Sequence, residues 1–153
     1  MYYINCFFIY SIIGFLFEHI IYFLLGHEGD SGILYGPWTP VYGIGILIII
    51  LVSNFIFKNL HSSKLLQTLV IFIAVVVLLT TIELLGGILI EKIFKITFWD
   101  YSNFKFHIGK YIALEISLAW GLLSIFVVYI IKPLLDKLIF KIPIWLTVIF
   151  ILL

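Results

Sequence analysis

The stretch that decides the fold is LQTLVIFIAVVVLLTTIELLGGILI, residues 66–90, in which Glu83 is the one charged residue. An α-helix needs about 20 apolar residues to cross the ~30 Å hydrocarbon core of a bilayer. Further apolar runs of about this length lie at residues 3–25, 41–57 and 111–131. Together they predict an all-α membrane protein, a polytopic helical bundle with four spans.

The composition of the whole chain supports a membrane protein. Of its 153 residues, 64% are hydrophobic and 11% are charged, and the mean hydropathy is +1.27. A soluble domain is close to half apolar and a quarter charged. The net charge is +1 and the nine basic residues are all lysine. Without a basic patch or an arginine we predict no nucleic-acid partner, and we expect residues 1–153 to form a single membrane domain in a lipid bilayer.

Two segments outside the four long runs also carry a prediction. Residues 142–153 are apolar but span only ~18 Å as a helix, which indicates a short or truncated fifth span. Residues 91–110 mix lysines with aromatic side chains, and such rings favour the headgroup region. We therefore expect an aromatic-rich interfacial loop between spans three and four. The connections on the N-terminal side hold five lysines and the opposite ones hold four, which favours an N-terminus inside the cell.

Three carboxylates inside the apolar runs are the candidate functional groups. Glu18, Glu83 and Glu115 would each cost roughly 2.5 to 3.5 kcal/mol as ions at a helix centre. All three fall in the same half of the bilayer, within ~5–10 Å of its midplane. Each lies on a stripe of small or polar residues: Ser11-Gly14-Glu18-Tyr22, Glu83-Gly87-Glu91 and Tyr111-Glu115-Ala119.

These stripes predict a shared polar pocket. If they face one another, Glu18, Glu83 and Glu115 converge, and either one of them is protonated or the group holds a cation. The competing interpretation is that each glutamate is a protonated, structural hydrogen-bonding group. Trp120, in the middle of span four, is expected to be core or lipid-facing filler. Asp100 is expected either to cap a short interfacial helix or to contact substrate.

Several motifs in chain order resemble one family. They are Tyr10-Ser11, Gly14 and Glu18; Gly36-Pro37, Pro40, Tyr42-Gly43 and Gly45; Glu83, Gly87 and Glu91-Lys92; and Trp99-Asp100-Tyr101-Ser102, Gly109 and Trp120-Gly121. With them the chain resembles the type IV ABC-transporter (CmpB-like) family of bacterial membrane proteins. The resemblance implies a multi-helix inner-membrane protein of the permease type.

The chain also departs from that family. Phe15 stands where members have a Trp, and Asp30-Ser31-Gly32 stands where they have Asn-Arg-Gly, so any anion-binding role of that Arg is lost. The family's fifth span usually continues further. No G-x-x-x-x-G-K-[ST] motif occurs, so any ATPase would be a separate subunit, and we expect a homo- or hetero-oligomer.

The predicted site follows from the stripes and the resemblance. The pocket or transport residues are Glu18, Glu83, Glu115, Glu91, Tyr42, Asp100 and Tyr101. The structural motif residues are Gly14, Gly36, Pro37, Pro40, Gly43, Gly87, Trp99 and Gly109. His19, His27 and Glu28 lack the H-E-x-x-H spacing, so we predict no metal, and we predict no cofactor.

Three functions remain open from the sequence. The first is a permease or transporter component whose pocket handles a proton, a cation or a cationic solute. The second is an intramembrane enzyme that uses the carboxylates as acid and base on a lipid-linked substrate. The third is a non-catalytic membrane partner of a larger complex. No nucleophile triad occurs, which favours the non-enzymatic functions.

Overall fold

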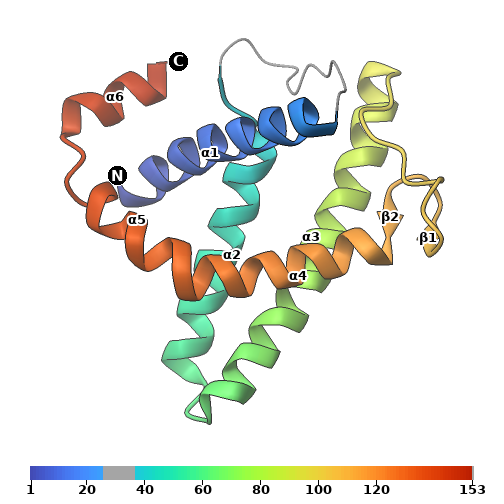
Figure 1. Ribbon diagram of the computed structural model, residues 1–153. Helices are drawn as coiled ribbons and strands as arrows, with labels where there is room; N and C mark the ends of the chain where they lie inside the picture. The colour runs from blue at the N-terminus through green and yellow to red at the C-terminus, as the bar shows by residue number, and fades with distance from the viewer. Residues whose placement is uncertain (26–36, 153) are drawn as a thin grey trace. The chain divides into compact units, whose positions relative to one another are not determined.

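A computed structural model describes residues 1–25 and 37–152 of the chain. Its long helices are α1 (Tyr2–Leu25), α2 (Pro40–Asn59) and α3 (Lys64–Phe94). They are followed by α4 (Leu114–Phe126), the π-helical segment η1 (Val127–Ile131), α5 (Lys132–Ile139) and α6 (Ile144–Leu152) (Figure 1). Four helical stretches in this part of the chain are long and apolar enough to cross a membrane, the fourth being Leu114–Ile139. The predicted all-α fold with four spans is confirmed.

The helix boundaries follow from local chemistry. Pro40 begins α2, where its fixed φ suits a first helical turn and its missing N–H is not needed. The side chain of Ser63 caps α3 by accepting a hydrogen bond from the backbone N–H of Leu66 at 3.3 Å. The same helix ends at Lys95, which has φ +59°. Pro133 is the second residue of α5, just after η1; because it has no N–H to donate, it interrupts the regular α-helical ladder there.

The segment between α3 and α4 forms a short hairpin. Strands β1 (His107–Ile108) and β2 (Ile112–Ala113) pair antiparallel, and Gly109 makes the turn with φ +62°. This conformation favours glycine and accounts for Gly109 as a motif residue. The prediction that span four is helical from about Tyr111 is wrong, because residues 112 and 113 are extended and α4 begins at Leu114.

The chain divides into two compact units. The first comprises residues 1–47 and 131–153, and the second comprises residues 48–130. The prediction that residues 1–153 form a single domain stays a prediction.

In the first unit, α1 packs against α5 and α6. Thr147 Oγ1 donates a hydrogen bond of 2.8 Å to Asn5 Oδ1, and both side chains are buried. Phe8 of α1 stacks on Phe150 of α6 with 5.3 Å between ring centroids. The predicted short C-terminal run therefore forms a helix, α6, that lies along α1 (Figure 1).

The start of α2 also lies close to α1 in this unit. A methyl group on Gly14 would overlap the ring of Tyr42, and one on Gly43 would overlap Phe7 and the Ser11 side chain. Small residues at both positions thus allow the two backbones to approach.

In the second unit, α3 and α4 run antiparallel in close contact. Thr80 Oγ1 donates to Ser117 Oγ at 2.7 Å, and a hydrogen bond of 2.7 Å joins the Thr68 and Tyr129 hydroxyls. Gly121 sits between these pairs, where a methyl group would overlap Phe72 and Val76. Hydroxyl pairs between the helices, and a glycine against larger apolar side chains of α3, are typical of helices that pack in a membrane.

Candidate functional site

Glu83 lies on the α4-facing side of α3 and is held through one oxygen. Its Oε1 accepts a hydrogen bond of 2.9 Å from Trp120 Nε1 of α4 and one of 3.2 Å from the hydroxyl of Tyr101. Both donors are neutral groups. The carboxylate is therefore oriented by two aromatic side chains that bring no compensating positive charge.

Three buried polar atoms in the second unit have no hydrogen-bond partner within the described residues. They are Oε2 of Glu83, Oε2 of Glu115 and Nε1 of Trp99. Buried polar atoms are seldom left without a partner, since the loss of hydration costs about 1 to 3 kcal/mol each. Two of the three atoms are carboxylate oxygens, which would accept a hydrogen bond or bind a positive charge.

Glu91, two turns beyond Glu83 on α3, ties the hairpin to the helix. Its Oε1 pairs with Lys110 Nζ at 2.7 Å, and its Oε2 accepts from the Tyr111 hydroxyl at 2.6 Å. The hydrogen bond to Glu91 raises the pKa of Lys110, and a hydrogen bond to the same carboxylate raises the pKa of Tyr111. The Tyr111 ring also covers Gly87.

The Trp99-Asp100-Tyr101-Ser102 motif forms a turn that delivers Tyr101 to Glu83. Asp100 Oδ1 accepts a hydrogen bond of 2.8 Å from the Ser102 backbone N–H, and the Ser102 hydrogen bonds lower the pKa of Asp100. Burial, followed by the nearby Glu83 carboxylate, raises the pKa of Tyr101, so its hydroxyl stays protonated and donates. The prediction that Asp100 caps a short helix is wrong, because residues 102 and 103 form a turn and no helix follows them. Its hydrogen bond to Ser102 stabilises that turn.

Glu115 lies in the first turn of α4 and has a different partner. Its Oε1 accepts a hydrogen bond of 3.1 Å from the backbone N–H of Phe106, just before β1. The predicted stripe of Tyr111, Glu115 and Ala119 is not the face of α4 that packs on α3. Ala119 is exposed, whereas the buried positions of α4 are Ser117, Gly121 and Ser124.

The predicted stripe fails because of where α4 begins. Since α4 begins at Leu114, the four-residue spacing does not place Tyr111 on the helical face of Glu115. The predicted stripe on α3 is different, because Glu83, Gly87 and Glu91 all contact α4 or the segment before it.

Glu18 belongs to the first unit. Its Oε1 accepts a hydrogen bond of 2.8 Å from the hydroxyl of Tyr42, so two predicted pocket residues are joined directly. Gly14 lies one turn before Glu18 and makes room for the Tyr42 ring. The convergence of Glu18 with Glu83 and Glu115 stays a prediction.

The chain was compared with known protein families. A family model described as "Putative ABC-transporter type IV" matches residues 5–153. The chain belongs to this family. No curated protein and no solved structure matches it significantly. With its four apolar helices, this member of the type IV family is a multi-pass membrane protein related to transport.

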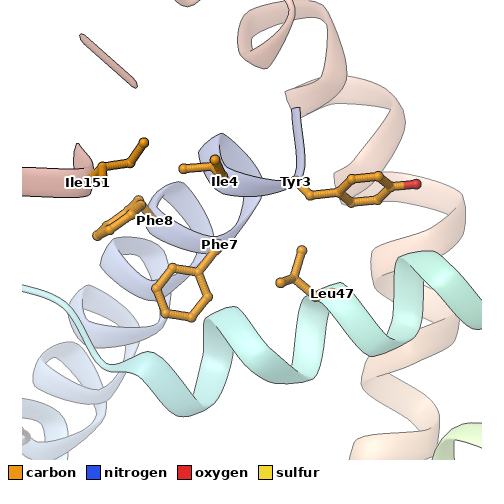
Figure 2. Close-up of a pocket in the computed structure, with 6 residues that line it drawn as sticks. All are labelled: Tyr3, Ile4, Phe7, Phe8, Leu47 and Ile151. Atoms are coloured by element: carbon orange, nitrogen blue, oxygen red, sulfur yellow. The ribbon is translucent and has the colours of Figure 1, made fainter. Parts of the chain in front are cut away.

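One hollow in the first unit of this family member is apolar. An open depression of about 370 Å³ in the first unit is lined by Tyr3, Ile4, Phe7, Phe8, Leu47 and Ile151 (Figure 2). None of the predicted pocket residues lines it. Its lining offers no carboxylate and suits a hydrocarbon chain.

Two residues of the site were missed in the sequence, and some predicted ones cannot be placed. Trp120 was expected to be core or lipid-facing filler, yet it donates to Glu83; its place within an apolar run gave no sign of this. Lys110 was counted only for orientation, yet it pairs with Glu91. Three of the residues named from the sequence lie outside the described residues: Gly36, His27 and Glu28. Pro37 lies three residues before α2, and Pro40 begins that helix.

Proposed function

We propose that this protein is a permease or transport component in the bacterial cytoplasmic membrane, with its N-terminus inside. Its working site is Glu83, which handles a proton, a cation or a cationic solute. Tyr101 and Trp120 position the carboxylate. Glu91 holds Lys110, whose backbone carbonyl accepts a hydrogen bond of 2.7 Å from the Tyr101 N–H. Glu115 is a further acidic group in the same unit, and Glu18, which accepts a hydrogen bond from Tyr42, is an acidic group of the first unit.

The observation that carries the proposal is the half-satisfied carboxylate of Glu83. The two ion pairs found among the described residues are Lys110–Glu91 and Lys132–Asp136, and neither neutralises Glu83. Glu91 is roughly 12 Å farther along the helix axis. A carboxylate within an apolar span is stable when it takes up a proton or a cation, and such residues commonly mark ion and proton pathways.

Oε2 of Glu83 is the atom that would bind the proton or cation. Oε1 already accepts from Tyr101 and Trp120, whereas the buried Oε2 has no partner in this part of the structure. Protonation at Oε2 or coordination of a cation there would leave the two aromatic hydrogen bonds in place. The site therefore supports reversible loading without rearrangement of its donors.

Membership of an ABC-transporter family supports transport over catalysis. Because the chain has no P-loop motif, ATP hydrolysis would come from a separate subunit. We propose such an ATPase, or another membrane subunit, as the partner of this chain in an oligomer.

The test uses the purified full-length protein in proteoliposomes. An entrapped pH-sensitive dye reports proton flux, and radiolabelled sodium, potassium and tetraethylammonium serve as cation probes. Glu83→Gln keeps the side-chain shape but cannot ionise, so flux should be lost; Glu83→Asp keeps a carboxylate and should retain part of it. Ser117→Ala, at the same helix contact but uncharged, is the control. Full flux in Glu83→Gln would contradict the proposal.

A further inference from the structure

The outward face of α5 combines apolar and basic side chains. Leu134 and Leu138, four residues apart, are 61% and 62% exposed. Lys137 and Lys141 are also exposed and are again four residues apart, so they lie beside the two leucines. Lys141 lies just after the end of α5, in a turn where its backbone N–H donates a hydrogen bond of 2.9 Å to the Leu138 carbonyl.

The inward face of the same helix carries its acidic residue. Ile139 is buried, and Asp136 accepts hydrogen bonds of 2.7 Å from Tyr2 of α1 and from Lys132. The Lys132 charge is therefore neutralised within the fold. Asp136 is the one acidic residue between positions 132 and 141, so nothing in this segment neutralises Lys137 or Lys141.

We infer that this face of α5 is a binding site for the headgroups of anionic phospholipids. Leu114–Ile139 has 26 residues, more than the ~20 that cross the hydrocarbon core, so its α5 end reaches the bilayer interface. There the leucines enter the acyl boundary and the lysines meet lipid phosphates. Positive charge without a counter-ion among the described residues gives the complementarity to an anionic surface. Trp145, 62% exposed in the first turn of α6, suits the same depth.

This inference is independent of the Glu83 site. It concerns residues of α5 and the turn after it, and it holds whether or not the protein transports a cation. A docked ATPase subunit would use the same lysines for a protein contact, and the experiment separates the two.

The experiment measures which lipids stay bound. The full-length protein is reconstituted in equimolar phosphatidylglycerol and phosphatidylcholine, extracted in mild detergent, and its retained lipids are quantified by mass spectrometry. The double variant Lys137→Gln/Lys141→Gln should lower the ratio of retained phosphatidylglycerol to phosphatidylcholine several-fold, up to roughly 30-fold for two lysines at an anionic surface. Lys137→Arg/Lys141→Arg keeps both charges and should restore the ratio.

The matched control changes the same number of charges elsewhere. Lys95→Gln/Lys105→Gln removes two exposed lysines from the segment between α3 and α4 and should leave the ratio unchanged. An unchanged ratio in the α5 variant, or an equal fall in both double variants, would overturn the inference. So would an α5 variant that loses a co-purifying ATPase subunit while its lipid ratio stays at the wild-type value.

Discussion

The hydroxyl of Tyr101 donates a hydrogen bond across 3.2 Å to Oε1 of Glu83, which also receives the indole N–H of Trp120 at 2.9 Å. The two donors come from different elements, the turn after α3 and the middle of α4. One carboxylate oxygen thus joins three segments of the second unit. Its donors should be coupled in stability as well as in function.

Removal of either donor should destabilise the protein, and removal of both should cost more than the sum. Tyr101→Phe and Trp120→Phe each keep an aromatic ring and should each lower the free energy of unfolding by about 1 kcal/mol. In the double variant Oε1 has neither donor, which should add an interaction energy of at least about 0.5 kcal/mol. Chemical denaturation in detergent micelles measures all three.

Exposed residues of the same types provide the controls. Tyr3→Phe and Trp145→Phe change side chains that are 46% and 62% exposed, and each should alter stability by less than about 0.5 kcal/mol. Strict additivity of Tyr101→Phe and Trp120→Phe would show that the two donors do not share one acceptor.

Adjacent glycines on α3 should respond in opposite directions to the same substitution. In Gly87→Ala the new methyl group would overlap the Tyr111 ring, so we expect a loss of about 1 to 3 kcal/mol. In Gly86→Ala the nearest side-chain atom is Cη2 of Trp99 at 3.9 Å, an ordinary contact. Because alanine also favours a helix, that variant should be neutral or more stable by up to about 1 kcal/mol.

Thermal unfolding of the two alanine variants, measured side by side, decides this prediction. Equal destabilisation would mean that both glycines are needed for the helix backbone alone. A stable Gly87→Ala protein would mean that Tyr111 does not lie over α3.

The ion pair between Lys110 and Glu91 should weaken at alkaline pH. Its hydrogen bond to Glu91 raises the pKa of Lys110 in the folded protein. A group whose pKa is raised by folding contributes its full stabilisation below its unfolded pKa, about 10.4 for lysine, and loses it as the pH rises through the folded value. The stability difference between wild type and Lys110→Met should therefore be constant near neutral pH and shrink above about pH 10.4.

Salt gives an independent check on the same pair. The two side chains are 48% and 41% exposed, so added salt should also reduce the difference. Lys105→Met, which removes an exposed lysine without a carboxylate partner in the described structure, should show a difference that is small at every pH. A pH-independent difference for Lys110→Met would argue against the ion pair.

The membrane-spanning helices could be predicted from the sequence, because they depend on length and composition. Residues 66–90 are so uniformly apolar that a membrane helix follows from their length alone, and α3 indeed extends from Lys64 to Phe94. Gly14 and Gly87 stand out in the sequence as small residues at helical spacing, and Gly43 only as part of the family motif; the structure has tight contacts at all three.

What the sequence could not predict depends on contacts between distant residues. Trp120 looks like any apolar span residue until Glu83 lies across from it, 37 positions away in the chain. The face of Glu115 could not be placed because the start of α4 is set by the pairing of β1 with β2, and neither strand has a strong sequence pattern. Lys110 likewise acquires its partner only when the hairpin folds back on α3.

Asp136 should be needed to attach the start of α1 to α5. It accepts hydrogen bonds of 2.7 Å from the Tyr2 hydroxyl and from Lys132 Nζ, and the Lys132 and Asp136 side chains are only 20% and 19% exposed. Asp136→Asn removes the charge and replaces one acceptor by a donor, leaving Lys132 without its counter-ion. We expect a loss of about 1 to 3 kcal/mol, measured by denaturation.

Hydrogen exchange locates that loss. Amide protection should fall in the first turns of α1 and in α5, with α3 and α4 unchanged at early times. The double variant Lys132→Met/Asp136→Asn removes the uncompensated charge and should regain part of the stability, because an unpaired, partly buried charge costs more than an absent pair. If Asp136→Asn matched Lys137→Gln, an exposed charge change in the same helix, the Tyr2–Asp136 contact would not stabilise the fold.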